Sequence, residues 1–281
     1  MTEIDYGRFG ERLEHARARG TAARWELLRA FQEEWGYEPS RAEGITLDDP
    51  EEDGSESVDP SLPVPAALRE WWELPFNSFA GKPRLYWTNP EWPPTVRPDP
   101  SGYGTSGGLP ADNPFVGPDE DLRVCVFMAE YEYCNEWGYA AARAALADPP
   151  VLVAAADDDG KEAWLPQSRS VSEFFLHLAV TRLPAHYGFS AYEGVAEPDL
   201  VARLRAALRP LGLLPWRELG SRGEYFGGPD VVVQYDPCGQ DFEFAAYGRT
   251  EEALRRLSGT LALGWSAEDI HEPDSRQDDD G

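Results

Sequence analysis

Lysine is nearly absent from this sequence, since only Lys82 and Lys161 occur among 25 basic residues, which face 51 acidic ones. The net charge of −26 makes the chain repel phosphate backbones and anionic membranes. We therefore expect no direct binding of nucleic acid and no binding to a membrane. Any partner selected by charge is expected to be a basic protein.

Sulfur and imidazole ligands are also scarce. The three cysteines are widely spaced without a CxxC motif, and the four histidines lie on separate segments without an HExxH or HxH motif: Cys125, Cys134, Cys238, His15, His177, His186 and His271. No GxSxG or GxxxxGK[ST] motif occurs. These absences predict reduced thiols, no disulfide framework, no metal and no cofactor.

Long apolar runs are missing as well. The longest, such as Val151 to Ala156, are far too short to span a bilayer, and the first residues are acidic rather than basic. We expect a cytoplasmic protein. The 281 residues are 42% hydrophobic, which is enough for one large or two modest globular domains.

Two acidic segments indicate how the chain is divided. Residues 43–59 carry eight acids and no base, and residues 268–281 carry seven acids against Arg276, so about twelve excess negative charges remain on the rest. Such runs are typical of solvated tails, although they can also attract a basic partner. We predict an N-terminal helical segment (1–42), an acidic linker (43–60), a main domain (61–180), an α+β extension or small lobe (181–265) and a disordered acidic tail (266–281).

Apolar spacing predicts the helices. Trp25, Leu28, Phe31 and Trp35 recur at steps of three and four residues and indicate a helix over 21–36, and similar spacing extends upstream of Gly20. A second helix is expected over about 65–74, with Pro65 in its first turn. Further capped helices are expected after Ser170, around Leu200 to Leu208, and after Thr250.

Strands are expected between these helices. The candidates are RLYW (84–87), RVCVFMA (123–129), the VLVAAA and KEAWLP hairpin (151–166), GEYF, DVVVQY and DFEFAAY. The proline-rich residues 88–121 are expected to form a long loop. Its GxGxxG match at 102–107 lacks the flanking strand and helix of a dinucleotide site.

The expected order is helix, strands, helix, and the remainder repeats this order as a C-terminal strand-strand-helix extension. The extension lies 80 positions after a similar unit, since Val231 follows Val151 and Thr250 follows Ser170 at that spacing. Whether 181–265 is a separate lobe or a true internal repeat stays open, because any two such units look alike at this level.

The run Glu130-Tyr131-Glu132-Tyr133 follows the most apolar strand. If the strand continues, the tyrosines pack inward and the glutamates face water. Alternatively, the run leaves the sheet beside Trp137 and Trp164 and forms an acidic, aromatic patch for a basic partner. The candidate partner-binding residues are Glu130, Tyr131, Glu132, Tyr133, Trp137 and Trp164. A third possibility, acid-base catalysis by Glu130 and Glu132, has no supporting motif.

Residues 61–180 carry a series of features in a fixed order. They are the Leu62-Pro63 helix entry ending in Trp71-Trp72, the strand Val124 to Ala129 followed by Glu130 and Trp137-Gly138, Asp148-Pro149-Pro150-Val151, Trp164, and the helix Ser170 to Leu178. In these features the segment resembles the SUKH superfamily, which joins fungal cell-wall-assembly regulators to bacterial toxin-immunity proteins. The family often has Glu-Asn-Gln after the central strand, where this chain has Glu130-Tyr131-Glu132. The resemblance implies an α+β fold, with a central, mostly antiparallel sheet flanked by helices and the C-terminal strand-strand-helix extension. It also implies no catalysis and a binding role, often direct neutralisation of a toxin such as a nuclease.

Two functions follow as expectations. One is a non-enzymatic, immunity- or antitoxin-like protein that neutralises a basic toxin. The alternative is an intracellular scaffold or regulatory protein with a cellular partner. The sequence names neither the partner nor the oligomeric state.

Overall fold

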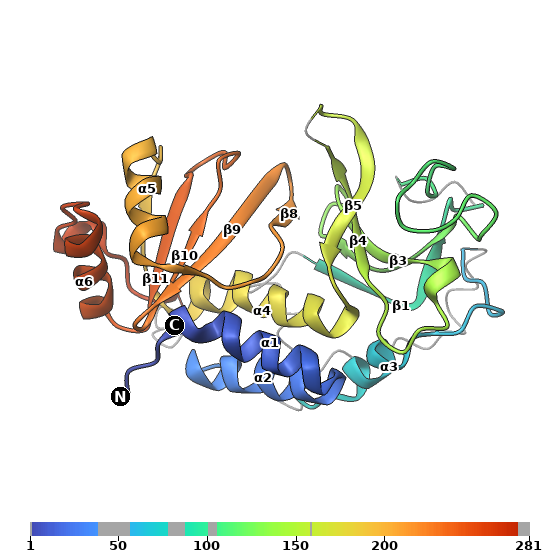
Figure 1. The fold of residues 1–281 in the computed structure, drawn as a ribbon, viewed down its shortest axis with the longest axis horizontal. Coiled ribbons are helices and arrows are strands. Elements are labelled where there is room, and N and C mark those ends of the chain that lie inside the picture. Colours follow the sequence, from blue (N-terminus) through green and yellow to red (C-terminus); the bar gives the residue numbers. More distant parts are fainter. Residues whose placement is uncertain (1, 39–56, 78–87, 101–105, 158, 275–281) are drawn as a thin grey trace. The chain divides into compact units, whose positions relative to one another are not determined.

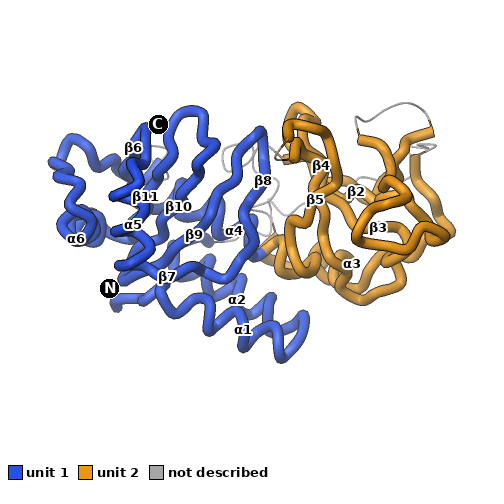
Figure 2. Tube along the Cα trace, turned by 45° about the horizontal axis from the view of Figure 1, so that its top comes forward, with its two compact units in different colours: residues 1–38, 176–281 blue, residues 39–175 orange. Residues whose placement is uncertain are grey.

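The computed structural model describes residues 2–38, 57–77, 88–100, 106–157 and 159–274. The chain divides into two compact units (Figure 2): unit 1 combines residues 1–38 with 176–281, and unit 2 comprises residues 39–175. The division expected from the sequence consists of continuous segments in chain order, whereas unit 1 is assembled from the two ends of the chain. The predicted N-terminal helical segment and C-terminal extension therefore contribute to the same compact unit.

Both units combine helices with antiparallel strands, which confirms the α+β class. The strands form two sheets, a five-stranded sheet in unit 2 and a six-stranded sheet in unit 1. Within the described residues no helix is both long and apolar enough to cross a membrane.

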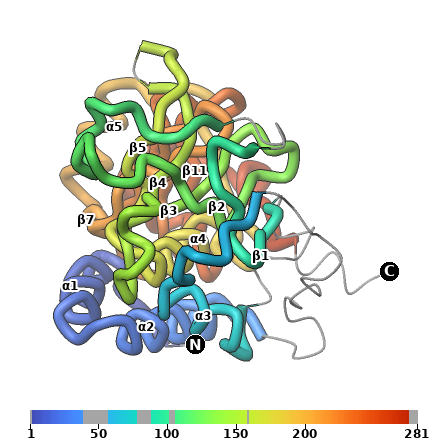
Figure 3. The backbone as a smooth tube through the Cα atoms, turned by 90° about the vertical axis from the view of Figure 1, so that its right-hand side faces the viewer, coloured from blue at the N-terminus to red at the C-terminus, as the bar shows by residue number. Residues whose placement is uncertain are grey.

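The sheet of unit 2 has the order β1-β2-β3-β4-β5, which can be followed in Figure 3. Its elements are α3 (Ala66–Glu73), β1 (Thr88–Arg97), β2 (Val124–Glu130), β3 (Glu136–Ala140), the short helix η4 (Ala141–Arg143), β4 (Val151–Ala156) and β5 (Glu162–Ser168). Every residue of β2 is buried, as the apolar run Val124 to Ala129 predicts for a strand covered on both faces. The predicted hairpin and the helix after Pro65 are confirmed.

Strand β1 corrects the prediction of a loop over residues 88–121. Residues 88–97 instead pair with β2, from Thr88 opposite Glu130 to Arg97 opposite Val124, with a register shift after Pro90. The prolines are tolerated because β1 is an edge strand, where one row of backbone N–H groups has no ladder partner to lose. The predicted strand 84–87, and all but residues 106 and 107 of the GxGxxG match, lie outside the described residues.

Aromatic rings fill the core of unit 2 on the face where helix α4 (Val171–Tyr187) begins. Trp71 of α3 stacks on Phe175 with ring centroids 3.7 Å apart, and Trp137 of β3 lies 5.9 Å from Phe174. The predicted cap of this helix is present, since Ser170 Oγ accepts a hydrogen bond from the amide of Glu173. Asp148 adds a second cap through the amide and hydroxyl of Ser172.

Unit 1 contains the remaining elements: η1 (Tyr6–Arg8), α1 (Phe9–Arg19), α2 (Thr21–Glu34), the part of α4 from Leu176, β6 (Phe189–Glu193), α5 (Pro198–Ala207), β7 (Arg209–Pro210), β8 (Trp216–Glu218), β9 (Ser221–Gly228), β10 (Val231–Tyr235), β11 (Phe244–Gly248), α6 (Glu251–Leu261) and η5 (Ala267–Asp269). The sheet order is β6-β11-β10-β9-β7, and β8 pairs with β9. The predicted helices at 21–36 and after Thr250 are confirmed, with Thr250 Oγ1 capping the amide of Ala253.

Helices α5 and α6 cover one face of this sheet (Figure 1), where Leu204, Leu254 and Leu257 pack on Phe226 and Val233. The opposite face carries Tyr225, which contacts His177 of α4. The same face carries Gly227, where a Cβ atom would lie 2.3 Å from the carbonyl oxygen of Tyr6. Only glycine lets η1 approach the sheet this closely.

Candidate partner-binding surface

The residues that follow β2 form a tight turn rather than an extension of the strand. The amide of Tyr133 donates to the carbonyl of Glu130 at 2.8 Å, and Tyr133 adopts a left-handed conformation with φ 61°. The amide of Glu130 donates to the carbonyl of Asn135, which closes the turn into β3. Alternation of side chains between two faces therefore stops at Glu130, and the pattern-based prediction of an extended ladder is wrong.

The carboxylate of Glu130 holds this turn from inside. It is only 3% exposed, and its Oε2 accepts hydrogen bonds from the amides of Glu132 at 2.9 Å and Cys134 at 3.3 Å. The side-chain amide of Asn89 donates to the carbonyl of Tyr131 from the neighbouring strand. Glu130 is thus a positioning residue of the turn, which corrects its prediction as an exposed contact residue.

The turn presents an aromatic ring and an acid to solvent. Tyr131 is 54% exposed, Glu132 is exposed, and Tyr133 is half-buried. Inward packing of Tyr131 is therefore wrong, because the residue lies beyond the last strand pair and has no sheet face to cover.

The two tryptophans predicted beside this run are buried on opposite faces of the sheet. Trp137 pairs with Val153, whereas Trp164 pairs with Ala154, and residues directly opposite in an antiparallel ladder share a face. Trp137 is fully buried, and Trp164 donates its indole N–H to the carbonyl of Gly107 at 2.8 Å. Neither ring joins an exposed aromatic patch, so this part of the prediction is also wrong.

A second turn lies at the same end of the sheet, because β2 and β4 both run toward it. In the β4–β5 hairpin, Asp157 Oδ1 accepts hydrogen bonds from the amides of Asp159 and Lys161 at 2.9 Å each. Asp159, Lys161 and Glu162 are exposed. We define the turn end of unit 2 as residues 131–134 together with Asp157 and residues 159–162. It carries four carboxylates against one lysine.

A buried charge network lies next to the turn, at the first residue of β3. The guanidinium of Arg97 donates to Glu136 Oε1 and to the hydroxyl of Thr95. Glu91 and Asp99 are also near the guanidinium, with N–O separations of 3.9 and 3.8 Å. Three carboxylates thus surround one cation in a site largely closed to water.

The electrostatics of this network shift the titration of Glu91. Burial raises the pKa of the Glu91 carboxyl above its usual value, and the neighbouring carboxylates of Glu136 and Asp99 add to the rise. The hydroxyl of Thr95 and the charge of Arg97 oppose it. The network attaches the edge strand β1 to β3 and thereby supports the turn that β3 follows.

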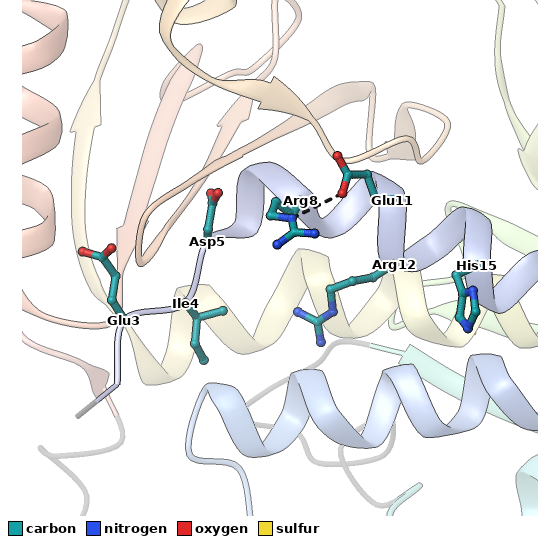
Figure 4. A pocket seen from close by; sticks show the side chains of 7 residues that line it. All are labelled: Glu3, Ile4, Asp5, Arg8, Glu11, Arg12 and His15. Carbon is teal, nitrogen blue, oxygen red and sulfur yellow. Dashed lines mark hydrogen bonds and ion pairs between the residues drawn. The ribbon is translucent and has the colours of Figure 1, made fainter.

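Unit 1 has a separate groove of about 670 Å³ along its N-terminal segment (Figure 4). Its lining residues are Glu3, Ile4, Asp5, Arg8, Glu11, Arg12 and His15. Arg8 is paired with Glu11, and Arg12 makes two hydrogen bonds to the carboxylate of Glu34. Because both arginines are already engaged and one short segment supplies the whole lining, the groove brings no separate parts of the chain together around a ligand.

Two side chains that could in principle take part in catalysis, Cys125 and His177, are buried. Burial raises the pKa of the Cys125 thiol to about 12, so this cysteine is a packing residue, as its place within β2 predicts. Burial lowers the pKa of His177 to about 3, and its ring contacts Trp216 at a centroid distance of 4.9 Å. In the part of the chain that the structure describes, no three histidine, cysteine or carboxylate side chains gather as a metal site.

Comparison with known proteins gives no match to a family model, a curated protein or a solved structure.

Of the residues predicted as partner-binding candidates, Tyr131 and Glu132 are exposed on the first turn, whereas sequence reasoning did not single out the second turn. The Asp157-Asp158-Asp159-Gly160 sequence predicted a hairpin turn, and the register of two adjacent hairpins would have placed it beside the first. The Arg97–Glu136 pair has no local sequence signal, because the two residues are 39 positions apart.

Proposed function

We propose that this chain is a non-enzymatic, cytosolic protein-binding protein, immunity- or antitoxin-like, that neutralises a basic toxin such as a nuclease. The turn end of unit 2 is its contact surface. The observation that carries the proposal is the grouping of Tyr131, Glu132, Asp159 and Glu162 on two adjacent turns at one end of a sheet.

The charge balance supports a basic partner. Thirteen arginines of the described residues are already in ion pairs with carboxylates of the same chain, among them Arg97, Arg123 and Arg143. The excess of 26 acids has no compensating cation within the sequence. Such a field accelerates association with a basic protein and makes the rate sensitive to salt. A nuclease active site binds phosphate and is basic, so an acidic ligand competes with its substrate.

The turn supports binding through its rigidity. Because the buried Glu130 carboxylate and Asn89 hold the backbone of residues 131–134, Tyr131 and Glu132 lose little freedom when a partner docks. An exposed tyrosine beside carboxylates provides contact area together with charge selectivity. The resemblance of residues 61–180 to the SUKH superfamily points in the same direction.

The proposal is tested by co-expressing the chain with toxins encoded beside it and measuring growth rescue and complex formation. We expect rescue by the wild-type chain, and loss of rescue in a variant that combines Glu132→Lys, Asp159→Lys and Glu162→Lys. The matched control is Asp119→Lys, since Asp119 is an exposed acid of the same unit that precedes β2 at the opposite end of the sheet. Absence of both rescue and complex with every neighbouring toxin would refute the immunity assignment.

A further inference from the structure

A row of three aromatic rings lies on unit 1. Tyr192 of β6 is its middle member, with ring centroids 4.4 Å from Phe242 and 5.9 Å from His271. The interplanar angles are 34° and 35°, so both neighbouring rings are tilted only moderately from the plane of Tyr192. We call Phe242, Tyr192 and His271 the ring row.

Backbone pairing fixes the ring row in place. His271 exchanges two backbone hydrogen bonds with Ser190 at the outer edge of β6, at 3.0 and 2.8 Å. Phe242 is positioned because the next residue, Glu243, donates its amide to the carbonyl of Gly194 just after β6. The buried ring of Tyr247 packs against Tyr192 edge-on, with the ring centroids 6.4 Å apart.

The ring row is accessible to a ligand. Phe242 is 41% exposed, His271 is exposed and Tyr192 is half-buried. The adjoining loop adds Val195, the most exposed large apolar side chain of the described residues at 65%. The ring row therefore forms a contiguous aromatic surface that is open to solvent, which is a feature of binding sites.

The chain segments around the ring row are acidic in sequence. The three segments that build it, residues 189–199, 236–248 and 265–274, contain ten acids and neither lysine nor arginine. Asp241 and Glu272, the neighbours of Phe242 and His271 in the chain, are both exposed. A cation above aromatic faces is attracted by the ring quadrupoles as well as by the carboxylates.

We propose that the ring row is a docking site for an arginine-bearing segment of a protein partner. A guanidinium is planar and stacks on aromatic rings while its N–H groups reach carboxylates, whereas an ammonium group is compact and strongly hydrated. A second copy of this chain is disfavoured as the occupant, because two chains of net charge −26 repel each other. The inference concerns residues of unit 1 and does not depend on the turn end.

The test is fluorescence anisotropy of a labelled glycine-serine peptide that carries arginines, titrated with the full chain, alongside matched peptides with lysine or uncharged citrulline in their place. We expect saturable binding in the order arginine, lysine, citrulline. Phe242→Ala should weaken arginine-peptide binding about fivefold, which corresponds to ~1 kcal/mol. Asp241→Asn should weaken it at low salt and have less effect at high salt.

The control is Leu219→Ala, which removes an exposed apolar side chain elsewhere in unit 1 and should leave binding unchanged. Far-ultraviolet circular dichroism checks that each variant stays folded. Equal affinity of Phe242→Ala and the wild-type chain, or equal affinity for the arginine and citrulline peptides, would overturn the proposal. Loss of peptide binding in Glu132→Lys but not in Phe242→Ala would also overturn it, since binding would then occur at the turn end.

Discussion

Glu136 Oε1 accepts two hydrogen bonds from Arg97, at 2.9 Å from Nε and 2.7 Å from Nη2, where neither side chain is more than 3% exposed. Asp99 is equally buried, and its carboxylate accepts a hydrogen bond from Ser57. This single cation therefore stabilises several buried anions at once.

Removal of the cation should destabilise unit 2. We expect Arg97→Met to cost about 3 kcal/mol or more, because it leaves buried carboxylates without a counterion. Glu136→Gln should cost less, since Glu91 and Asp99 remain near the guanidinium. Hydrogen exchange of the β2 and β3 amides under increasing urea measures both changes, and equal protection in wild-type and Arg97→Met chains would contradict the assigned role.

Replacement of Glu91 by an uncharged side chain should stabilise the chain. Because the folded-state pKa of Glu91 lies above its usual 4.5, the ionised carboxyl is disfavoured by the fold at neutral pH. Glu91→Gln should therefore raise the melting temperature of the chain at pH 7, while keeping an acceptor for Thr95. The gain should shrink as the pH falls through the raised pKa toward 4.5, where the wild-type carboxyl also binds a proton. A lower melting temperature of the variant at pH 7 would exclude this interpretation.

His177 should make unit 1 sensitive to mild acid. Its folded-state pKa is about 3 against an ordinary 6.5, so only the unfolded chain binds a proton between these values. The free energy of unfolding should fall by ~1.4 kcal/mol per pH unit below 6.5 from this group alone. His177→Leu, of similar volume, should reduce the loss between pH 7 and pH 5 in urea titrations. An unchanged pH dependence in this variant would show that His177 is not responsible.

The sequence predicts the elements with strong local patterns. The helices at 21–36 and after Thr250, the strand after Arg123 and the hairpin at 151–166 all appear, because periodic apolar residues and capping side chains are local signals. Strand β1 was missed because its prolines oppose strand formation, and its edge position, which makes them tolerable, depends on tertiary structure. The assembly of the two ends of the chain into unit 1 likewise has no local sequence signal.

The candidate site was only partly predictable for a similar reason. Alternation predicts the face of a side chain only while a strand continues, and β2 ends at Glu130. The turn that follows contains Tyr133 in a left-handed conformation, for which tyrosine gives no sequence signal. Trp137 and Trp164 looked accessible because tryptophan is common at interfaces, yet the register places them on opposite buried faces.

Substitutions of Glu130 can test whether this residue holds the turn in place or contacts the partner directly. Glu130→Ala removes the acceptor for two turn amides, so the exchange rates of the Glu132 and Cys134 amides should rise. The cost should be about 1–2 kcal/mol, and partner affinity should fall although Glu130 itself touches no partner. Glu130→Gln keeps one acceptor oxygen and should recover part of both losses. A direct contact role predicts instead that the affinity falls while the turn amides stay protected.

The most direct test of the account is the association rate of the chain with the basic toxin that we propose as its partner, measured by stopped flow at low and high salt. The account predicts that the triple variant Glu132→Lys, Asp159→Lys and Glu162→Lys associates at least tenfold more slowly than wild type at low salt, that the difference shrinks at high salt, and that Asp119→Lys has little effect. Equal association rates for the triple variant and the wild-type chain would contradict the assignment of the turn end as the contact surface.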